Sequence, residues 1–89
     1  MIYQIIFTEA ALKDIERLKT SGDNAVLKKL AKLFLELQEH PHTGTGKIEH
    51  LKHYDIETLS RRINREHRLI YRVEDETITV LVLGSFGHY

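Results

Sequence analysis

Hydrophobic and polar residues alternate with different periods along the chain, and each period predicts an element. The first apolar stretch, residues 2–7, is rich in β-branched and aromatic residues, which predicts a short strand. Two stretches with helical spacing follow. Their apolar stripes are formed by Ala11, Leu12, Ile15 and Leu18, and then by Val26, Leu30, Leu33 and Leu37. Stripes of this width predict helices that pack on a core rather than bind a ligand.

Capping residues mark where these two helices begin and end. Thr8 precedes the first helix and can accept a hydrogen bond from one of its unpaired N–H groups. Gly22 can adopt the left-handed conformation that ends a helix, and Asp23 can cap the second helix, over residues 24–39. Pro41 ends it, because the residue before a proline is disfavoured in helical geometry. The short connection predicts an antiparallel helical hairpin.

The second half of the chain changes to a period of two, which is typical of strands. Four strands are predicted, over residues 48–53, 59–64, 67–73 and 77–83, and the last and most apolar one is predicted to be central. The loop at residues 43–47 contains two glycines and a lysine, but its spacing differs from that of a phosphate-binding loop, so it is predicted to be a connector.

The predicted order of elements is β-α-α-β-β-β-β within a single domain, residues 1–89. We expect an α+β fold in which the N-terminal helical hairpin packs on one face of a mostly antiparallel sheet. The other face of the sheet then remains available for function.

The densest positive charge lies within residues 60–73, which contain five of the 13 lysines and arginines. Strand alternation divides this stretch into two faces, with Arg68, Ile70 and Arg72 on one, and His67, Leu69, Tyr71 and Val73 on the other. An arginine-bearing face suits an anion, because a guanidinium donates two hydrogen bonds to a phosphate and keeps its charge. The alternative is a solvated face on which the arginines cover apolar surface.

Composition narrows the possible functions. The chain has no cysteine, which excludes a disulfide framework and a thiol nucleophile and is typical of the cytoplasm, where we expect the protein to act. No signal segment or membrane-spanning run is present. Thirteen acidic residues balance 13 basic ones, so we expect the protein alone to bind free RNA weakly. The six histidines are not grouped with a carboxylate or cysteine set, so we expect neither a metal nor another cofactor.

Several motifs, taken in order, resemble the YoeB/Txe toxins of the RelE superfamily. They are Gly44-x-Gly46-Lys47, Ile48-Glu49-His50-Leu51-Lys52-His53, Ser60-Arg61-Arg62-Ile63, Glu66-His67-Arg68-Leu69-Ile70-Tyr71 and the terminal His88-Tyr89. The resemblance implies a RelE-like fold and the toxin of a type II toxin–antitoxin system, a ribosome-dependent mRNA endoribonuclease that inhibits translation. It also implies a cognate YefM/Axe-like antitoxin, whose disordered segment wraps the toxin, and either a homodimer or a toxin–antitoxin hetero-oligomer.

The resemblance also assigns residues. The family's catalytic positions fall on Glu49, Arg68, His88 and Tyr89, and its substrate-binding positions on the basic residues Lys52, Arg62 and Arg65. The chain departs from the family at three places. Leu59 stands where many members have a tryptophan, and Phe86 and Gly87 stand where some members have an arginine and a tyrosine.

The assigned residues match the requirements of metal-free RNA cleavage. In that reaction the 2′-hydroxyl attacks the neighbouring phosphate, and Glu49, Arg68 and His88 supply the base, the stabilising cation and the acid. Histidine suits the acid role because it exchanges a proton near neutral pH. The alternatives are an ordinary ion pair for Glu49, a disordered chain end for His88, and a non-catalytic module that binds the ribosome or an antitoxin. Convergence of Glu49, Arg68 and His88 on one open face would favour the enzyme.

Overall fold

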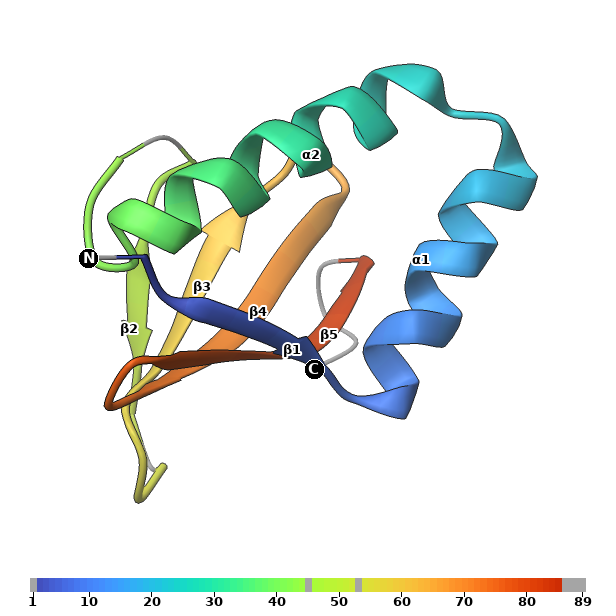
Figure 1. Ribbon diagram of the computed structural model, residues 1–89. Coiled ribbons are helices and arrows are strands. Elements are labelled where there is room, and N and C mark those ends of the chain that lie inside the picture. The colour runs from blue at the N-terminus through green and yellow to red at the C-terminus, as the bar shows by residue number, and fades with distance from the viewer. Residues whose placement is uncertain (1, 45, 53, 86–89) are drawn as a thin grey trace.

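Seven elements follow one another in the predicted order (Figure 1). The computed structural model describes residues 2–44, 46–52 and 54–85. Its elements are β1 (Gln4–Phe7), α1 (Glu9–Ser21), α2 (Asn24–Glu39), β2 (Glu49–Leu51), β3 (Thr58–Arg62), β4 (His67–Glu74) and β5 (Thr77–Ser85). The strands form one sheet of order β1-β5-β4-β3-β2, in which β1 and β5 are parallel and all other neighbours are antiparallel. The α+β class and the mostly antiparallel sheet are confirmed.

The centre of the sheet differs from the prediction, because β4 rather than β5 is the middle strand. The strand β5 lies between β4 and β1, and β1 pairs with its first half, from Thr77 to Val80. Apolar sequence therefore identified an interior strand, but the exact place in the sheet depends on where β1 adds. Four consecutive residues of β4, Arg68 to Tyr71, are buried, so residues on both faces of this strand have little contact with solvent.

The helix boundaries follow the capping residues. The Thr8 side chain accepts from the Ala11 N–H at 3.1 Å, and the Asp23 side chain accepts from the Val26 N–H at 3.2 Å. Gly22 ends α1 with φ of 74°, in the left-handed region that favours glycine. Each of these interactions joins residues close in sequence, which explains why they could be predicted.

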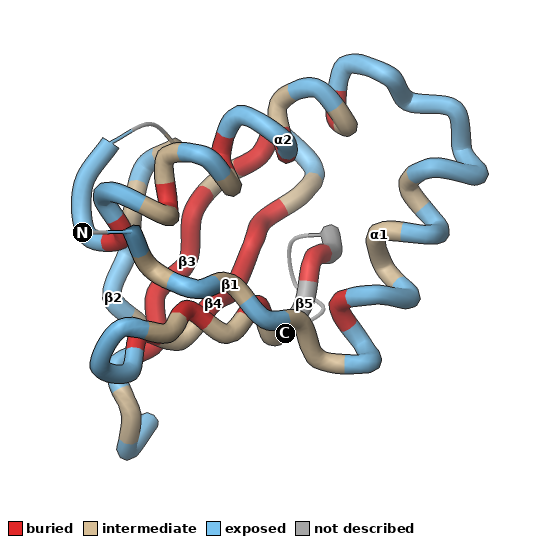
Figure 2. Tube along the Cα trace, viewed as in Figure 1, coloured by how far each residue is buried: buried red, intermediate tan, exposed pale blue. Residues whose placement is uncertain are grey.

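Both helices lie on one side of the sheet, but they diverge from their turn instead of running alongside each other (Figure 1). The helix α1 is attached to β5, where Thr8 Oγ1 donates to the Leu81 carbonyl at 2.6 Å and Asp14 Oδ2 accepts from the Leu83 N–H at 3.0 Å. The helix α2 crosses the sheet and buries its apolar stripe against it (Figure 2). The core cluster contains Ala11, Val26, Leu30, Leu33, Leu37, Leu59, Ile63, Leu69, Tyr71, Val73, Ile78, Val80 and Leu83.

The predicted division of β4 into two faces is confirmed for its core side. Leu69, Tyr71 and Val73 belong to the core under the helices. Arg68 alternates with them and lies on the opposite side, which we call the open face because no helix covers it (Figure 1). The open face of β2, β3 and β4 carries Glu49, Ser60 and Arg68.

Candidate active site

Three strands bring Glu49, Ser60 and Arg68 together on the open face. Glu49 and Ser60 are directly paired between β2 and β3, and Arg62 and Arg68 are directly paired between β3 and β4. Arg68 Nη2 donates to Glu49 Oε1 at 3.0 Å, while Arg68 Nη1 donates to Ser60 Oγ. The guanidinium of β4 therefore reaches across β3 to the edge strand, so the fold brings together two of the residues that the resemblance assigns.

Burial of the Glu49–Arg68 ion pair is strongly unequal. The Arg68 side chain is 6% exposed and the Glu49 side chain is 55% exposed. Ser60, which accepts one hydrogen bond from Arg68, is itself buried. The protein thus holds the cation in a fixed orientation, whereas the carboxylate reaches solvent. The pair therefore combines a preorganised guanidinium with an accessible carboxylate.

The other predicted basic residues flank this pair. Arg62 is the last residue of β3, directly opposite Arg68. Arg65 is exposed in the turn that follows, where Asn64 Oδ1 accepts from the N–H groups of Glu66 and His67 at 2.9 and 2.8 Å. Lys52 is exposed directly after β2, beyond the other end of the Glu49 strand. Positive charge is therefore placed on both sides of the ion pair along the strands.

The predicted acid and stacking residues, His88 and Tyr89, lie outside the described residues. The last described strand leads toward the ion pair, because the backbone of Gly84 is paired with Arg68 and that of Ser85 with His67. Two departures from the family, Phe86 and Gly87, also lie outside the described part. Leu59, the third departure, is fully buried in the core beneath the helices, where it replaces the bulkier family residue without reaching the open face.

Sequence reasoning missed the contacts of Ser60 with Arg68 and of Arg61 with Glu36, although Ser60 and Arg61 belong to the Ser60-Arg61-Arg62-Ile63 motif. Strand alternation could have identified Ser60, because it shares a face with Arg62 and therefore with Arg68. Arg61 points the other way and is 0% exposed. Its guanidinium lies between α2 and the loop that follows it, with Glu36 Oε1 3.4 Å from Nη1. Strand alternation separates Arg61 from Ser60 and Arg62, but no local pattern shows that the face of Arg61 is the covered one.

The described histidines do not form a metal centre. Glu57 contacts two of them, with Oε1 2.8 Å from His42 Nε2 and Oε2 3.8 Å from His50 Nδ1. No group of three potential ligands suited to a metal ion is present within residues 2–44, 46–52 and 54–85. His50 is paired with Leu59 and so alternates away from Glu49 on β2, which separates it from the ion pair.

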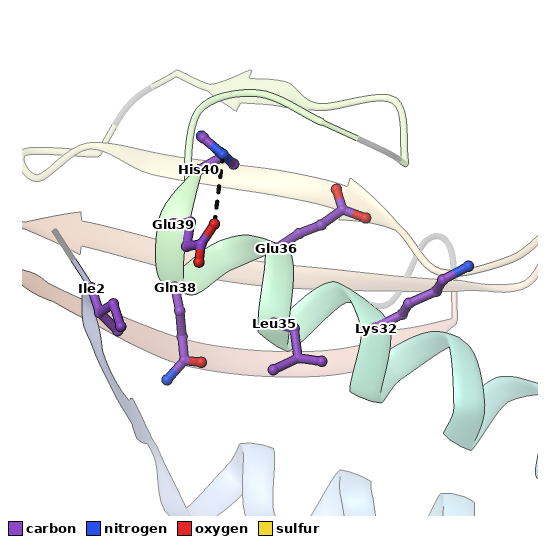
Figure 3. A pocket seen from close by; sticks show the side chains of 7 residues that line it. All are labelled: Ile2, Lys32, Leu35, Glu36, Gln38, Glu39 and His40. Carbon is purple, nitrogen blue, oxygen red and sulfur yellow. Dashed lines mark ion pairs between the residues drawn. The ribbon is translucent and has the colours of Figure 1, made fainter.

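A hollow of about 370 Å³ lies at the C-terminal end of α2, away from the ion pair (Figure 3). Its lining comes mainly from α2 and consists of Ile2, Lys32, Leu35, Glu36, Gln38, Glu39 and His40. Neither Glu49 nor Arg68 reaches it. The described residues that the resemblance assigns therefore lie at the sheet and do not line this hollow.

Comparisons with known proteins identify a family of toxins. A family described as the YoeB-like toxin of bacterial type II toxin–antitoxin systems matches residues 7–89. Toxin YoeB of Escherichia coli (strain K12) is 40% identical over 67 residues, which are 75% of this chain and 77% of that protein. The YoeB dimer from Staphylococcus aureus is 32% identical, with a TM-score of 0.80 over 100% of both chains. The YoeB–YefM complex from the same organism is 31% identical, with a TM-score of 0.79 over 100% of both chains.

Proposed function

Because the chain belongs to the YoeB-like toxin family of bacterial type II toxin–antitoxin systems, we propose that it is a ribosome-dependent mRNA endoribonuclease centred on Glu49 and Arg68. One observation carries the proposal: a buried guanidinium, held by Ser60, stands beside a solvent-accessible carboxylate on the open face. This arrangement supplies a cation and a proton acceptor at one place, which is what cleavage through the 2′-hydroxyl needs.

The proposed reaction needs no metal. Glu49 takes the proton of the RNA 2′-hydroxyl, whose oxygen bonds to the adjacent phosphorus. Arg68 stabilises the additional negative charge on the phosphate oxygens in the transition state. The bond from phosphorus to the 5′-oxygen breaks, and His88 donates a proton to that oxygen while Tyr89 stacks on a base. The products are a 2′,3′-cyclic phosphate and a 5′-hydroxyl end.

Substrate binding by this chain should depend on the ribosome. Lys52, Arg62 and Arg65 contact phosphates on either side of the cleaved bond in the proposed complex. The net charge of zero nevertheless gives the protein little general attraction for free RNA at physiological salt. The ribosome then holds the mRNA in position, so that the protein meets its substrate in the orientation needed for cleavage.

The partner of this toxin is a YefM-like antitoxin in our proposal. It rests on the similarity to the S. aureus toxin that has been solved with YefM. A segment of the antitoxin that is disordered when free would wrap the toxin and inhibit it, and the S. aureus YoeB dimer makes self-association a second possible assembly. We place this activity in the cytoplasm, where mRNA is translated. Within the described residues, no helix has the length and apolar content of a membrane span.

Primer extension on a reporter mRNA in a translating extract tests the proposed activity. We expect new 5′ ends within the ribosome-bound codon after addition of the protein, and far fewer with Glu49→Gln. Fragments with 5′-hydroxyl ends become ligatable only after phosphorylation, whereas a metal-dependent nuclease that leaves 5′-phosphates gives directly ligatable ends. Ribosome binding without new ends would instead support a non-catalytic module, and rapid cleavage of free RNA at physiological salt would contradict ribosome dependence.

A further inference from the structure

The buried arginine of β3 is surrounded by the loop that leads to β2. Arg61 Nη2 lies 3.0 Å from the Thr43 carbonyl oxygen, 3.2 Å from that of His40 and 3.4 Å from that of Pro41. These carbonyls belong to the glycine loop, which we define as residues 40–47, of which Thr45 is not described. One side chain of the sheet thus binds three main-chain groups of a connecting segment.

Tyr71 on β4 completes this contact from the neighbouring strand. Its hydroxyl donates to the Pro41 carbonyl oxygen at 2.6 Å and lies 3.3 Å from Arg61 Nη2. The Arg61 guanidinium carbon is 5.8 Å from the centroid of the Tyr71 ring, within the range of a cation–π interaction. Burial raises the pKa of Tyr71, which keeps the hydroxyl protonated and able to donate. We call Arg61 and Tyr71 the clamp.

The glycine loop has no room for side chains where it passes the clamp. A Cβ at Gly46 would lie 2.6 Å from Arg61 Cγ and 2.6 Å from the Arg62 carbonyl oxygen, and a Cβ at Gly44 would collide with the Glu36 carboxylate. Both glycines also have positive φ, 117° at Gly44 and 101° at Gly46. The Arg62 N–H donates to the Gly46 carbonyl, so the loop is fitted closely against β3.

The position of Glu49 depends on this fit. Its strand β2 has three residues, lies at the edge of the sheet and begins three residues after Gly46. A short edge strand is held by few hydrogen bonds, so local opening costs it little free energy. The strand β3 thus holds this part of the chain twice: its backbone pairs with β2, and its Arg61 side chain binds the preceding loop.

We propose that Arg61 and Tyr71 are positioning residues, which hold the glycine loop against β3 and thereby keep Glu49 beside Arg68. The catalytic role of Glu49 rests on the proposed function, but the position of Glu49 beside Arg68 does not. The clamp acts from the helix side of the sheet and leaves the guanidinium of Arg68 in place. Loosening the clamp should therefore displace the Glu49 carboxylate more than the Arg68 guanidinium.

Two variants and one control separate positioning from general stability. Tyr71→Phe keeps the ring in the core and removes the hydroxyl that donates to the Pro41 carbonyl. Arg61→Lys keeps a positive charge but lacks the planar fork that reaches several acceptors. Val26→Ala, at the start of α2, lowers stability from a core position that does not touch the glycine loop, so it serves as the control.

Amide hydrogen exchange gives a result that does not depend on activity. We expect exchange in residues 40–51 to be at least several-fold faster in Tyr71→Phe, and faster again in Arg61→Lys if it folds, while β4 and β5 exchange as in the wild type. Val26→Ala should show no such selective change. Unchanged exchange in residues 40–51 of Tyr71→Phe would overturn the proposal.

Single-turnover cleavage on ribosomes then measures the consequence. We expect the maximal rate of Tyr71→Phe to fall about tenfold, because the general base is misplaced, while the half-saturating toxin concentration changes little. Val26→Ala should cleave as the wild type does at a temperature where both are folded. A wild-type rate for Tyr71→Phe would overturn the positioning role. If the wild type cleaves nothing, the proposed function fails, and hydrogen exchange alone decides whether the clamp places Glu49.

Discussion

The two faces of the β3–β4 pair each carry a buried arginine bonded to a glutamate, and the two differ in what surrounds them. Arg61 is 0% exposed on the helix side, where its acceptors are Glu36, the Tyr71 hydroxyl and three loop carbonyls. Arg68 is 5% exposed on the open side and binds the Ser60 hydroxyl and the Glu49 carboxylate. Neither burial nor pairing with a glutamate distinguishes them.

The exposure of the partner does distinguish them. The Glu49 side chain is 55% exposed and the Glu36 side chain is 29% exposed, so the carboxylate beside Arg68 is the more accessible of the two. The acceptors of Arg61 include main-chain carbonyls of the adjoining loop, which cannot be exchanged for a ligand without unfolding it. A buried arginine whose partner reaches solvent is suited to function, whereas one enclosed by main-chain groups is suited to structure.

The largest expected effect is a loss of stability when Arg61, on the helix side of the sheet, is replaced. Arg61→Met should lower the free energy of unfolding by about 3–5 kcal/mol, because it removes the donor of several loop carbonyls and one of the partners of Glu36. Urea unfolding followed by circular dichroism measures this. Arg17→Met, at an exposed ion pair on α1, should change the value by less than about 0.5 kcal/mol. A loss below about 1 kcal/mol at Arg61 would remove the distinction between the two faces.

Arg68→Ala should have the opposite profile, with a large effect on activity and a smaller one on stability. Glu49 is left at the surface, where water solvates it, while cleavage on ribosomes falls roughly 100- to 1000-fold because the stabilising cation is lost. Arg68→Lys should recover little, since a lysine cannot donate in the same bidentate geometry. Arg17→Ala should cleave normally. If Arg68→Ala retained cleavage within a few-fold of the wild type, Arg68 would have no part in the reaction.

A smaller effect is expected at Ser60, which orients the functional arginine. Ser60→Ala removes the acceptor of Arg68 Nη1 and should reduce cleavage about tenfold, with about 1 kcal/mol lost from the free energy of unfolding. Parallel cleavage and unfolding assays measure the two quantities. Ser21→Ala, which removes an exposed hydroxyl at the end of α1, is the matched control. Equal cleavage by both variants would mean that Arg68 needs no support from β3.

The smallest effect is a pH dependence from the clamp. Burial raises the pKa of Tyr71 above its ordinary value of 10.0, so the folded protein keeps a proton that the unfolded chain releases. The stabilisation from Tyr71 is therefore complete below pH 10 and is lost as the pH rises toward the folded-state pKa. Between pH 10 and 11 the free energy of unfolding should fall by up to about 1.4 kcal/mol per unit more in the wild type than in Tyr71→Phe. If the free energy of unfolding fell equally with pH in the two proteins, the Tyr71 hydroxyl would have the same pKa in the folded and unfolded states.

The sequence by itself determined the features that depend on neighbouring residues. Thr8, Gly22 and Asp23 placed the helix boundaries, because a cap contacts a backbone group only three residues away. Period-two alternation separated Leu69 and Tyr71 from Arg68, because successive side chains of a strand point to opposite faces. Resemblance to a toxin family singled out Glu49 and Arg68, which periodicity alone does not connect.

Only the tertiary structure decided which residues meet across the sheet. The central place of β4, the short distance from Arg68 to Glu49 and the burial of Arg61 each depend on strand order and register between segments far apart in sequence. Arg61 and Arg62 are adjacent and chemically identical, yet alternation on β3 sends one to the glycine loop and the other to the open face. Their surroundings differ because the helices cover one side of the sheet and not the other.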